Sequence, residues 1–279
     1  MLLVGVHTRP AVFSAKRAGF EVYSVDYFGA MDTKRVADVS RSIILQKSYR
    51  SMGRMSLDYS GEKLVDLAKD LEADYVIPLS TVDLKKRNIV GNIPGVMRGI
   101  KDKEYQLKRV DKLGFSVPES EVVRSRGEAR DVAEDMGFPV VIKPIRGAGG
   151  RGVAMAKNLS EIPKIGDKML LQRYVSGKKL SVSTLSSRDD SKMLSTSVQI
   201  LGSRLLNQGG FVYCGNIVPF LGLDEAMLKK IEHMAVEISR SFGVVGWNGI
   251  DFVVGDEPVF MELNPRFQGT MSCVERSYG

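Results

Sequence analysis

Residues 249–269 read GIDFVVGDEPVFMELNPRFQG, a pattern that predicts two strands joined by a tight turn. A two-residue turn at 256–257 would place Asp251 directly opposite Glu262, and opposed side chains in such a pair have Cβ atoms about 5 Å apart. Asn264 lies two residues beyond Glu262 and therefore points to the same face. The hairpin is thus predicted to gather two carboxylates and one amide.

Two facing carboxylates repel each other by about 3 kcal/mol at an effective dielectric constant of about 20, so this arrangement requires a cation. Carboxylate and amide oxygens form a hard, all-oxygen site that suits Mg²⁺, with Mn²⁺ as a second candidate, and such ions also take phosphate oxygens. The alternative is a solvated hairpin with scattered charges. The expected register also pairs residue 254 with residue 259, and a slip of one residue would move Glu262 to the other face.

The composition is that of a globular protein without a membrane span. Of the 279 residues, 43% are hydrophobic and 26% are charged, and no apolar run approaches the roughly 18 residues that cross a bilayer. The first residues, MLLVGV, have no basic region before them and predict a buried strand rather than a secretory signal. Cys214 and Cys273 offer neither a disulfide framework nor metal-ligand spacing. We therefore expect a cytoplasmic protein with no membrane partner.

The net charge of +7 would suit a polyanion, such as nucleic acid or the phosphates of a nucleotide. The basic residues are spread along the chain, and residues 85–87 form the only tight basic trio. Aromatic residues do not alternate with basic ones as they do in RNA-binding segments. Nucleic acid is therefore not the expected partner, and a basic solvated surface is the alternative explanation of the charge.

Residues 1–100 are predicted to form a small doubly wound α/β unit with its ligand edge at the carboxyl ends of the strands. The expected elements are strands at 2–6, 20–26 and 74–80 and helices at 10–18 and 61–73. Thr8 is expected to cap the first helix. The GxGxxG string is absent after the first strand, so dinucleotide binding is not expected there.

Residues 101–186 are predicted to form a small antiparallel sheet with one or two helices, and residues 187–279 a second α+β unit. Ser125 and Glu128 have the spacing of a capping box. The strands expected in the small sheet are 138–144, 152–157, 169–175 and 179–187. In the last unit, a helix is expected from the N-cap Asp224 to Phe242, followed by the acidic hairpin.

The segment Gly147–Gly152 matches GxGxxG as a string, but a strand-like VAMAK follows it where a dinucleotide fold needs a helix. A glycine-rich loop between two antiparallel strands predicts a flap whose backbone N–H groups close over phosphate. Arg146 and Arg151 add positive charge, and Lys143 ends the strand before the loop. The alternative is a flexible surface hairpin.

Taken together, residues 101–270 resemble the ATP-grasp superfamily. The matching motifs are Asp102–Lys103, FPVVIKP with its glycine loop, LLQRYVSGKKLSV, and the acidic hairpin, in that order. The string NPRFQGT is most similar to the biotin-carboxylase branch, and the resemblance extends to archaeal proteins described as predicted carboligases. The first 95 residues resemble the domain that usually precedes this fold. The resemblance therefore implies an ATP-grasp fold of α/β and α+β parts.

The resemblance implies that ATP lies between the flap sheet and the C-terminal sheet, with one or two Mg²⁺ ions. Residues 172–175 would form the hinge against adenine. The catalytic groups would be Arg266 and Lys143, and the metal ligands would be Asp251, Glu262 and Asn264. The nucleotide would contact Lys103, Lys143, Arg146, Gly147, Gly149, Gly150, Gly152, Gln172, Arg173, Tyr174, Val175 and Lys179.

The chain departs from the family pattern at several positions. Gln172 stands where the hinge usually begins with Glu, and Lys179, which has no acceptor capacity, stands where an acid usually binds the ribose hydroxyls. Gln268 is followed by Gly269 where biotin carboxylase has an acid and a histidine, which puts chemistry from bicarbonate in doubt. The chain ends at Gly279, where relatives continue, which indicates a truncated chain or a missing closing helix.

The expected function is an ATP-dependent ligase that joins a small carboxylate to an amine or thiol through an acylphosphate, with release of ADP and phosphate. The alternatives are an ATP-binding regulatory or sensor protein without turnover, and a carboxylase or kinase on the same scaffold. A homodimer is a possible assembly. The residues expected near a substrate are His7, Thr8, Arg9, Asp26 and Ser80 in the first unit and Arg204, Asn207 and Gln208 in the last.

Overall fold

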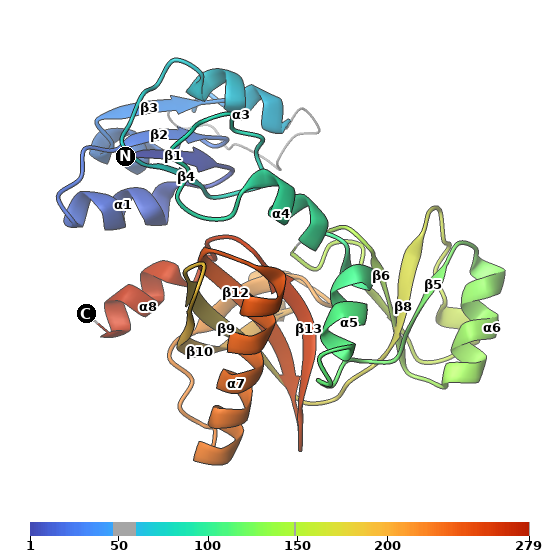
Figure 1. Cartoon of the computed structure of the whole chain (residues 1–279). Coiled ribbons are helices and arrows are strands. Elements are labelled where there is room, and N and C mark those ends of the chain that lie inside the picture. The colour runs from blue at the N-terminus through green and yellow to red at the C-terminus, as the bar shows by residue number, and fades with distance from the viewer. Residues whose placement is uncertain (47–59, 148, 279) are drawn as a thin grey trace.

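The structure, a computed structural model, describes residues 1–46, 60–147 and 149–278. These residues form three sheets, one in each of three neighbouring parts of the molecule (Figure 1). Ala148, which belongs to the predicted glycine loop, lies outside the described residues.

The N-terminal sheet is parallel and has the strand order β3-β2-β1-β4. Its helices and strands are β1 (Leu2–Gly5), α1 (Arg9–Arg17), β2 (Tyr23–Asp26), α2 (Met31–Val36), β3 (Val39–Ser42), α3 (Gly61–Ala68) and β4 (Val76–Pro78). The predicted α/β character of this part is confirmed. Helix α2 and strand β3 were not predicted, because both are short and neither has a strong apolar period.

Two residues expected at the ligand edge of this sheet are instead bonded to each other. Thr8 occupies the N-cap position of α1, but its hydroxyl makes no capping hydrogen bond. The Thr8 Oγ1 atom lies 2.7 Å from Ser24 Oγ and donates to Asp26 at 3.2 Å. Asp26 also accepts from the Gly29 N–H at 2.7 Å and so holds the turn after β2. Burial raises the pKa of Asp26.

The small sheet is antiparallel and has the order β5-β8-β6-β7, with α6 packed against it (Figure 1). Its elements are β5 (Ser120–Val123), α6 (Arg126–Met136), β6 (Val140–Pro144), β7 (Ala154–Ala156), the 3₁₀ helix η1 (Leu159–Glu161) and β8 (Met169–Arg173). The predicted N-cap at Ser125 is confirmed, because the Glu128 N–H donates to Ser125 Oγ at 3.1 Å. The Glu128 carboxylate accepts from the Arg124 N–H at 2.7 Å, one residue before the position that a capping box requires.

The large sheet is also antiparallel and has the order β11-β10-β9-β12-β13. Its elements are β9 (Lys178–Ser186), β10 (Ser191–Leu201), the 3₁₀ helix η2 (Arg204–Leu206), β11 (Tyr213–Ile217), α7 (Glu225–Phe242), β12 (Gly246–Val254) and β13 (Pro258–Asn264). The expectation that residues 179–187 form a strand of the small sheet is wrong, because residues 179–186 belong to β9 of the large sheet. Strand β9 pairs with β10 on one side and with β12 on the other.

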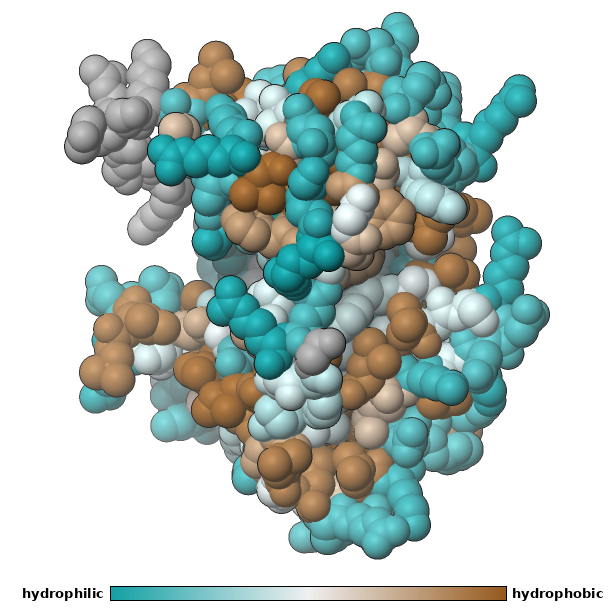
Figure 2. All heavy atoms as spheres, turned by 90° about the vertical axis from the view of Figure 1, so that its left-hand side faces the viewer, coloured by the Kyte–Doolittle hydropathy of each residue, from teal (hydrophilic) through white to brown (hydrophobic). Residues whose placement is uncertain are grey.

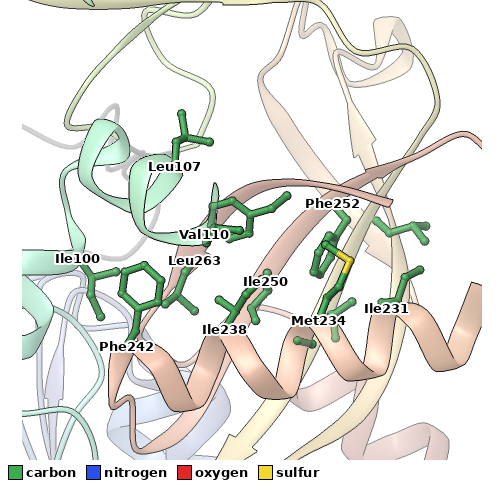
Figure 3. Packing of buried hydrophobic residues seen from close by; sticks show 14 of the residues in the cluster. Ile100, Leu107, Val110, Ile231, Met234, Ile238, Phe242, Ile250, Phe252 and Leu263 are labelled. Atoms are coloured by element: carbon green, nitrogen blue, oxygen red, sulfur yellow. The ribbon is translucent and has the colours of Figure 1, made fainter. Parts of the chain in front are cut away.

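Helix α7 covers one face of the large sheet, and the core of this part lies between them. The predicted start is confirmed, because Asp224 accepts from the Met227 N–H at 2.8 Å. The apolar stripe of α7 packs on side chains from β12, β13 and α5 (Lys103–Asp111) (Figure 3). Burial of this stripe fixes which face of the sheet remains open to the small sheet.

Two links fasten the N-terminal sheet to the rest of the molecule. Asn92 precedes α4 (Pro94–Ile100) and is buried. Its side chain donates to Asn248 Oδ1 at 2.6 Å and to the Pro265 carbonyl at 3.0 Å, and it accepts from the Val245 N–H at 2.7 Å. At the other link, helix α8 (Met271–Tyr278) packs beside α1 (Figure 1).

The surface is mixed in character. Figure 2 shows one face on which hydrophobic residues form separate small groups among hydrophilic ones. Among the described residues, no helix combines the length and the apolar character needed to cross a bilayer. Both cysteines are free thiols.

Candidate active site

The acidic hairpin forms with a different register from the predicted one, yet it brings the same two acids together. Val254 pairs with Pro258 rather than with residue 259, because the turn contains three residues, 255–257. A β-bulge then leaves Met261 without a partner across the hairpin, and Asp251 pairs with Glu262 as predicted. A bulge adds one residue to one strand, so it cancels the shift that the longer turn introduces.

The Asp251 carboxylate is held by side chains from three strands. The Ser181 hydroxyl on β9 donates to Oδ1 at 2.7 Å, and the Asn264 amide on β13 donates to Oδ2 at 3.2 Å. Gln199 on β10 also donates to this carboxylate. Ser181 faces Asp251 because the two residues are direct partners in the pairing of β9 with β12.

Positive charge already lies beside the acids. The Lys103 ammonium, at the start of α5, lies 3.0 Å from Glu262 Oε1 and donates to the Gly147 carbonyl at 3.0 Å. Lys103 and Lys143 are both buried. Helix α5 is positioned by Gln106, whose buried side chain donates to the Leu263 carbonyl at 3.0 Å and accepts from the Leu263 N–H at 2.6 Å.

Burial perturbs two groups of this charge cluster. Burial raises the pKa of Asp251 to about 6, and the Glu262 carboxylate adds to the rise, while the hydrogen bonds from Ser181 and Gln199 oppose it. Burial lowers the pKa of Lys143 to about 8, and Glu262 opposes that change. Perturbed groups that meet in a cleft are typical of functional sites.

The glycine loop between β6 and β7 reaches across to the large sheet. The Gly149 carbonyl accepts from the Tyr213 N–H at 3.4 Å. Gly150 has φ +73°, and a Cβ atom at this position would lie 1.9 Å from the Phe211 carbonyl oxygen. Only glycine allows this approach, so the loop packs closely on the connection between β10 and β11.

A cleft between the small and large sheets brings most of the predicted nucleotide and metal residues together. It is lined by the predicted residues Lys103, Lys143, Gly147, Gly149, Gly150, Gln172, Arg173, Tyr174, Val175, Lys179, Asp251 and Glu262. Apolar side chains, among them Val141, Phe211 and Met261, complete the walls. The cleft therefore combines apolar walls with charged groups gathered near the acid pair.

Four predicted residues lie outside this lining in the described part of the chain. Asn264 and Arg266 line a second cavity, which shares Asp251 and Glu262 with the cleft. Arg146 lines a third cavity together with Arg266. Gly152 packs on Pro144, because a Cβ atom there would lie 3.1 Å from the proline Cγ.

Residues 172–174, which were expected to form the hinge, are held by contacts to residues outside the cleft lining. The buried Gln172 amide donates to Ser120 Oγ at 2.8 Å, and Arg173 forms an ion pair with Glu119 at 2.8 Å. The Tyr174 N–H donates to the Pro139 carbonyl at 3.1 Å. Lys179 lies on β9, paired with Val253, and lines the cleft.

The residues that the sequence suggested for substrate binding do not lie together in the structure. His7 and Ser80 line a cavity with Arg266 and Gln268, between the N-terminal sheet and the segment after β13. Arg9 forms an ion pair with Asp32. The remaining expected residues of the last unit, Arg204, Asn207 and Gln208, are exposed.

Sequence reasoning missed Ser181, Gln199 and Phe211 as site residues. A signal was present for Ser181, because β9 alternates buried apolar Leu180 and Val182 with serines on the opposite face. That alternation identifies the two faces of a strand but does not say which strand lies beside it. Phe211 contacts Gly150 through its backbone carbonyl. Such a contact does not depend on the residue type, so the sequence cannot indicate it.

The sequence was compared with protein families and with known proteins. The ATP-grasp domain family matches residues 100–270, which is more than half of the chain. An uncharacterised protein of Methanocaldococcus jannaschii is 28% identical over 99% of this chain and 70% of its own length. A formate-dependent phosphoribosylglycinamide formyltransferase of Prochlorococcus marinus is 21% identical over 92% of this chain and 66% of its own length.

The fold is also found among solved structures. A complex of biotin carboxylase with β,γ-ATP from Campylobacter jejuni superposes with a TM-score of 0.75 at 18% identity, covering 99% of this chain and 67% of that one. The chain thus spans about two thirds of the length of these proteins. With the family match over most of the length, the chain belongs to the ATP-grasp family.

Proposed function

We propose that this protein is an ATP-dependent ligase that joins a small carboxylate to an amine or a thiol. The observation that carries the proposal is the meeting of three features in one cleft. These are the acid pair Asp251 and Glu262, the buried lysines Lys103 and Lys143, and the glycine loop. The formate-dependent formyltransferase to which the chain is similar is named for a carboxylate and an amine.

The acid pair has a donor set that fits a divalent cation. Asp251 and Glu262 supply carboxylate oxygens, and Asn264 lies beside Asp251 with its N–H group turned to that carboxylate. The Lys103 ammonium 3.0 Å from Glu262 occupies a position where positive charge is favoured. When bound, Mg²⁺ or Mn²⁺ would neutralise charge on the phosphate oxygens that it shares with these residues.

The rest of the cleft fits a nucleotide. Lys103 and Lys143, which line the cleft, would contact phosphate oxygens, and Gly147, Gly149 and Gly150 would supply backbone groups to them. Residues 172–175 would lie against adenine. Lys179 and Arg173 would lie near the ribose, and Arg146 and Gly152 would act at the base of the loop.

In the proposed reaction, an oxygen of the substrate carboxylate attacks the γ-phosphorus, the bond to the β,γ-bridging oxygen breaks, and ADP leaves. Lys143 and Arg266 would balance the negative charge that spreads over the phosphoryl oxygens, so catalysis rests on position and electrostatics. The amine nitrogen then attacks the carbonyl carbon of the acylphosphate. The C–O bond to phosphate breaks, and the nitrogen loses a proton as phosphate departs.

A second candidate function is ATP sensing without turnover. It is favoured by two departures at the hinge, the Gln172 amide bonded to Ser120 and the cation Lys179 at the expected ribose position. A carboxylase or kinase on the same scaffold is a further alternative. Product analysis separates them: the ligase yields an amide with ADP and phosphate, a kinase a stable phosphorylated product, and a sensor no ADP.

Isothermal titration with Mg·ATP tests the nucleotide step. The wild type is expected to bind, and Asp251→Ala with Glu262→Ala should reduce the affinity by at least tenfold, because two carboxylates that would ligate the ion are lost. The control is Asp256→Ala with Glu257→Ala, which removes two exposed acids from the turn of the same hairpin. The absence of heat with the wild type, or equal affinity in both double variants, would sink the proposal.

A further inference from the structure

The cleft continues past the hinge residues into a further cavity, which we call the mouth cavity. Its volume is about 560 Å³, and it adds residues of β7, of the start of β9 and of the connection between β10 and β11. The lining residues that it shares with the cleft are Val153, Tyr174, Lys179, Gln199, Leu201 and Phe211. The nucleotide site proposed above therefore has room beyond the hinge that adenine and the phosphates do not use.

The mouth cavity has a positively charged lining. Among the described residues, the lining contains two lysines, Lys178 and Lys179, and no acidic residue. The Lys178 ammonium lies 4.5 Å from the centre of the Phe220 ring, which is not part of the lining. Successive side chains of a strand point to opposite faces, so Lys179 is the lysine that faces the cleft.

Strand pairing determines where Lys179 lies in the cleft. Lys179 pairs with Val253, and Ser181 pairs with Asp251, in one continuous register of β9 with β12. Lys179 therefore shares the face of Ser181 and lies two residues, or about 7 Å along the strand, from it. The Lys179 side chain lines both the cleft and the mouth cavity, so it stands where the two meet.

Lys179 has no counter-ion in the part of the chain that the structure describes. It is half-buried and forms no ion pair with another described residue. Two other cations of the cleft are paired. Lys103 lies 3.0 Å from Glu262, and Arg173 lies 2.8 Å from Glu119. A cation that is partly withdrawn from water loses hydration, and an anionic partner compensates this loss best.

The surroundings of Lys179 do not favour a neutral sugar. Ribose hydroxyl groups donate most strongly to a carboxylate, and the mouth cavity has none among the described residues. The carboxylates that line the cleft, Asp251 and Glu262, are those proposed to bind the metal ion. An ammonium offers three donors and no acceptor. This end of the cleft is therefore better suited to an anionic group than to free hydroxyls.

We propose that Lys179 makes the cleft select an adenine nucleotide that carries a phosphate on its ribose over one with free ribose hydroxyls. The proposal rests on the nucleotide site described under the proposed function, with adenine against residues 172–175. A phosphate on the 2′ or the 3′ oxygen would lie in the mouth cavity and accept hydrogen bonds from the Lys179 ammonium. Hydrogen bonds between two charged groups are about twice as strong as neutral ones, so a hydroxyl in the same place is held less tightly.

Competition calorimetry tests this selection. AMP, adenosine 2′,5′-bisphosphate and adenosine 3′,5′-bisphosphate are each used to displace a non-hydrolysable ATP analogue from the protein in Mg²⁺, which confines the measurement to the cleft. At least one bisphosphate is expected to bind the wild type about tenfold more tightly than AMP does. Lys179→Met should lose this preference. Lys179→Glu should reverse it, because a carboxylate accepts from ribose hydroxyls and repels a phosphate.

The matched control is Lys178→Met, which removes the same charge one residue away, from a side chain that lies over Phe220. This variant should keep the tenfold preference. The proposal is overturned if the wild type prefers neither bisphosphate to AMP, or if Lys178→Met and Lys179→Met reduce the preference equally, as a general attraction to basic residues would require. The ATP analogue binds in both of these cases. A failure of the ligase proposal differs from them, because the wild type then does not bind the analogue at all.

Discussion

At the scale of single residues, the site depends on charges that the fold holds against their preference. Asp251 is half-buried close to a second carboxylate, and its pKa is raised to about 6. Lys143 is buried, and its pKa is lowered to about 8. Both shifts mean that the charged form is disfavoured in the folded protein. A protein that keeps such groups sacrifices stability for the chemistry that they support.

This trade predicts that Asp251→Asn stabilises the metal-free protein. The folded-state pKa of about 6 lies above the ordinary value of 3.8, so the wild type loses stability as the pH rises from about 4 through about 6. At pH 8 the variant should have a free energy of unfolding about 3 kcal/mol higher than the wild type, because one pKa unit corresponds to about 1.4 kcal/mol. Urea unfolding in a chelator at several pH values measures this.

The difference in the free energy of unfolding between Asp251→Asn and the wild type should shrink toward zero at pH 4. At that pH the side chain at position 251 is neutral in the folded wild type as well as in the folded variant. Asp256→Asn, at the exposed turn of the same hairpin, is the control and should show no such dependence on pH. An Asp251→Asn protein that is no more stable than the wild type at pH 8 would contradict the view that this carboxylate is held against its preference.

At the scale of elements, the backbone geometry of the glycine loop determines how closely the loop packs on the large sheet beside the cleft. Gly149 and Gly150 have nearly equal φ values of +68° and +73°, so an alanine at either position adds similar backbone strain. Only at Gly150 would the new Cβ meet another atom, the Phe211 carbonyl oxygen. The two positions therefore separate the effect of strain from the effect of contact with the large sheet.

Gly150→Ala is expected to bind Mg·ATP about tenfold more weakly than Gly149→Ala, because the added methyl group pushes the loop away from the large sheet. Gly150→Ala should also have the lower melting temperature of the two, because its Cβ atom meets the Phe211 carbonyl oxygen. Titration calorimetry and thermal unfolding measure these quantities. Equal affinities in the two variants would show that the contact with Phe211 has no part in closing the loop.

Several helices and strands were predicted from the sequence, and others were not. The helix cap at Ser125, the helix that begins after Asp224 and the pairing of Asp251 with Glu262 were predicted from local pattern and are confirmed. The predicted register of the hairpin was wrong next to the turn. The longer turn and the β-bulge shift the register in opposite directions, so the pairing at Asp251 is as predicted. The sheet to which β9 belongs was also mispredicted, because alternation describes the faces of a strand and not its neighbours.

At the scale of the whole molecule, the order of four motifs predicted the family, and the family match confirms it. What the sequence did not reveal is how the N-terminal sheet is fastened. Asn92 contacts three points of the C-terminal part, and Glu275 on α8 accepts hydrogen bonds from Ser14 and Arg17 on α1. These are single polar contacts between residues more than 150 positions apart, and no local pattern encodes them.

The proposed function requires a divalent ion and a triphosphate to meet at the acidic hairpin. The most direct measurement is anomalous diffraction from crystals grown with Mn²⁺ and a non-hydrolysable ATP analogue. The predicted result is a manganese peak in contact with both the Asp251 and the Glu262 carboxylates, with the phosphates under the glycine loop. A nucleotide bound elsewhere, or a metal peak that touches neither acid, would contradict the account.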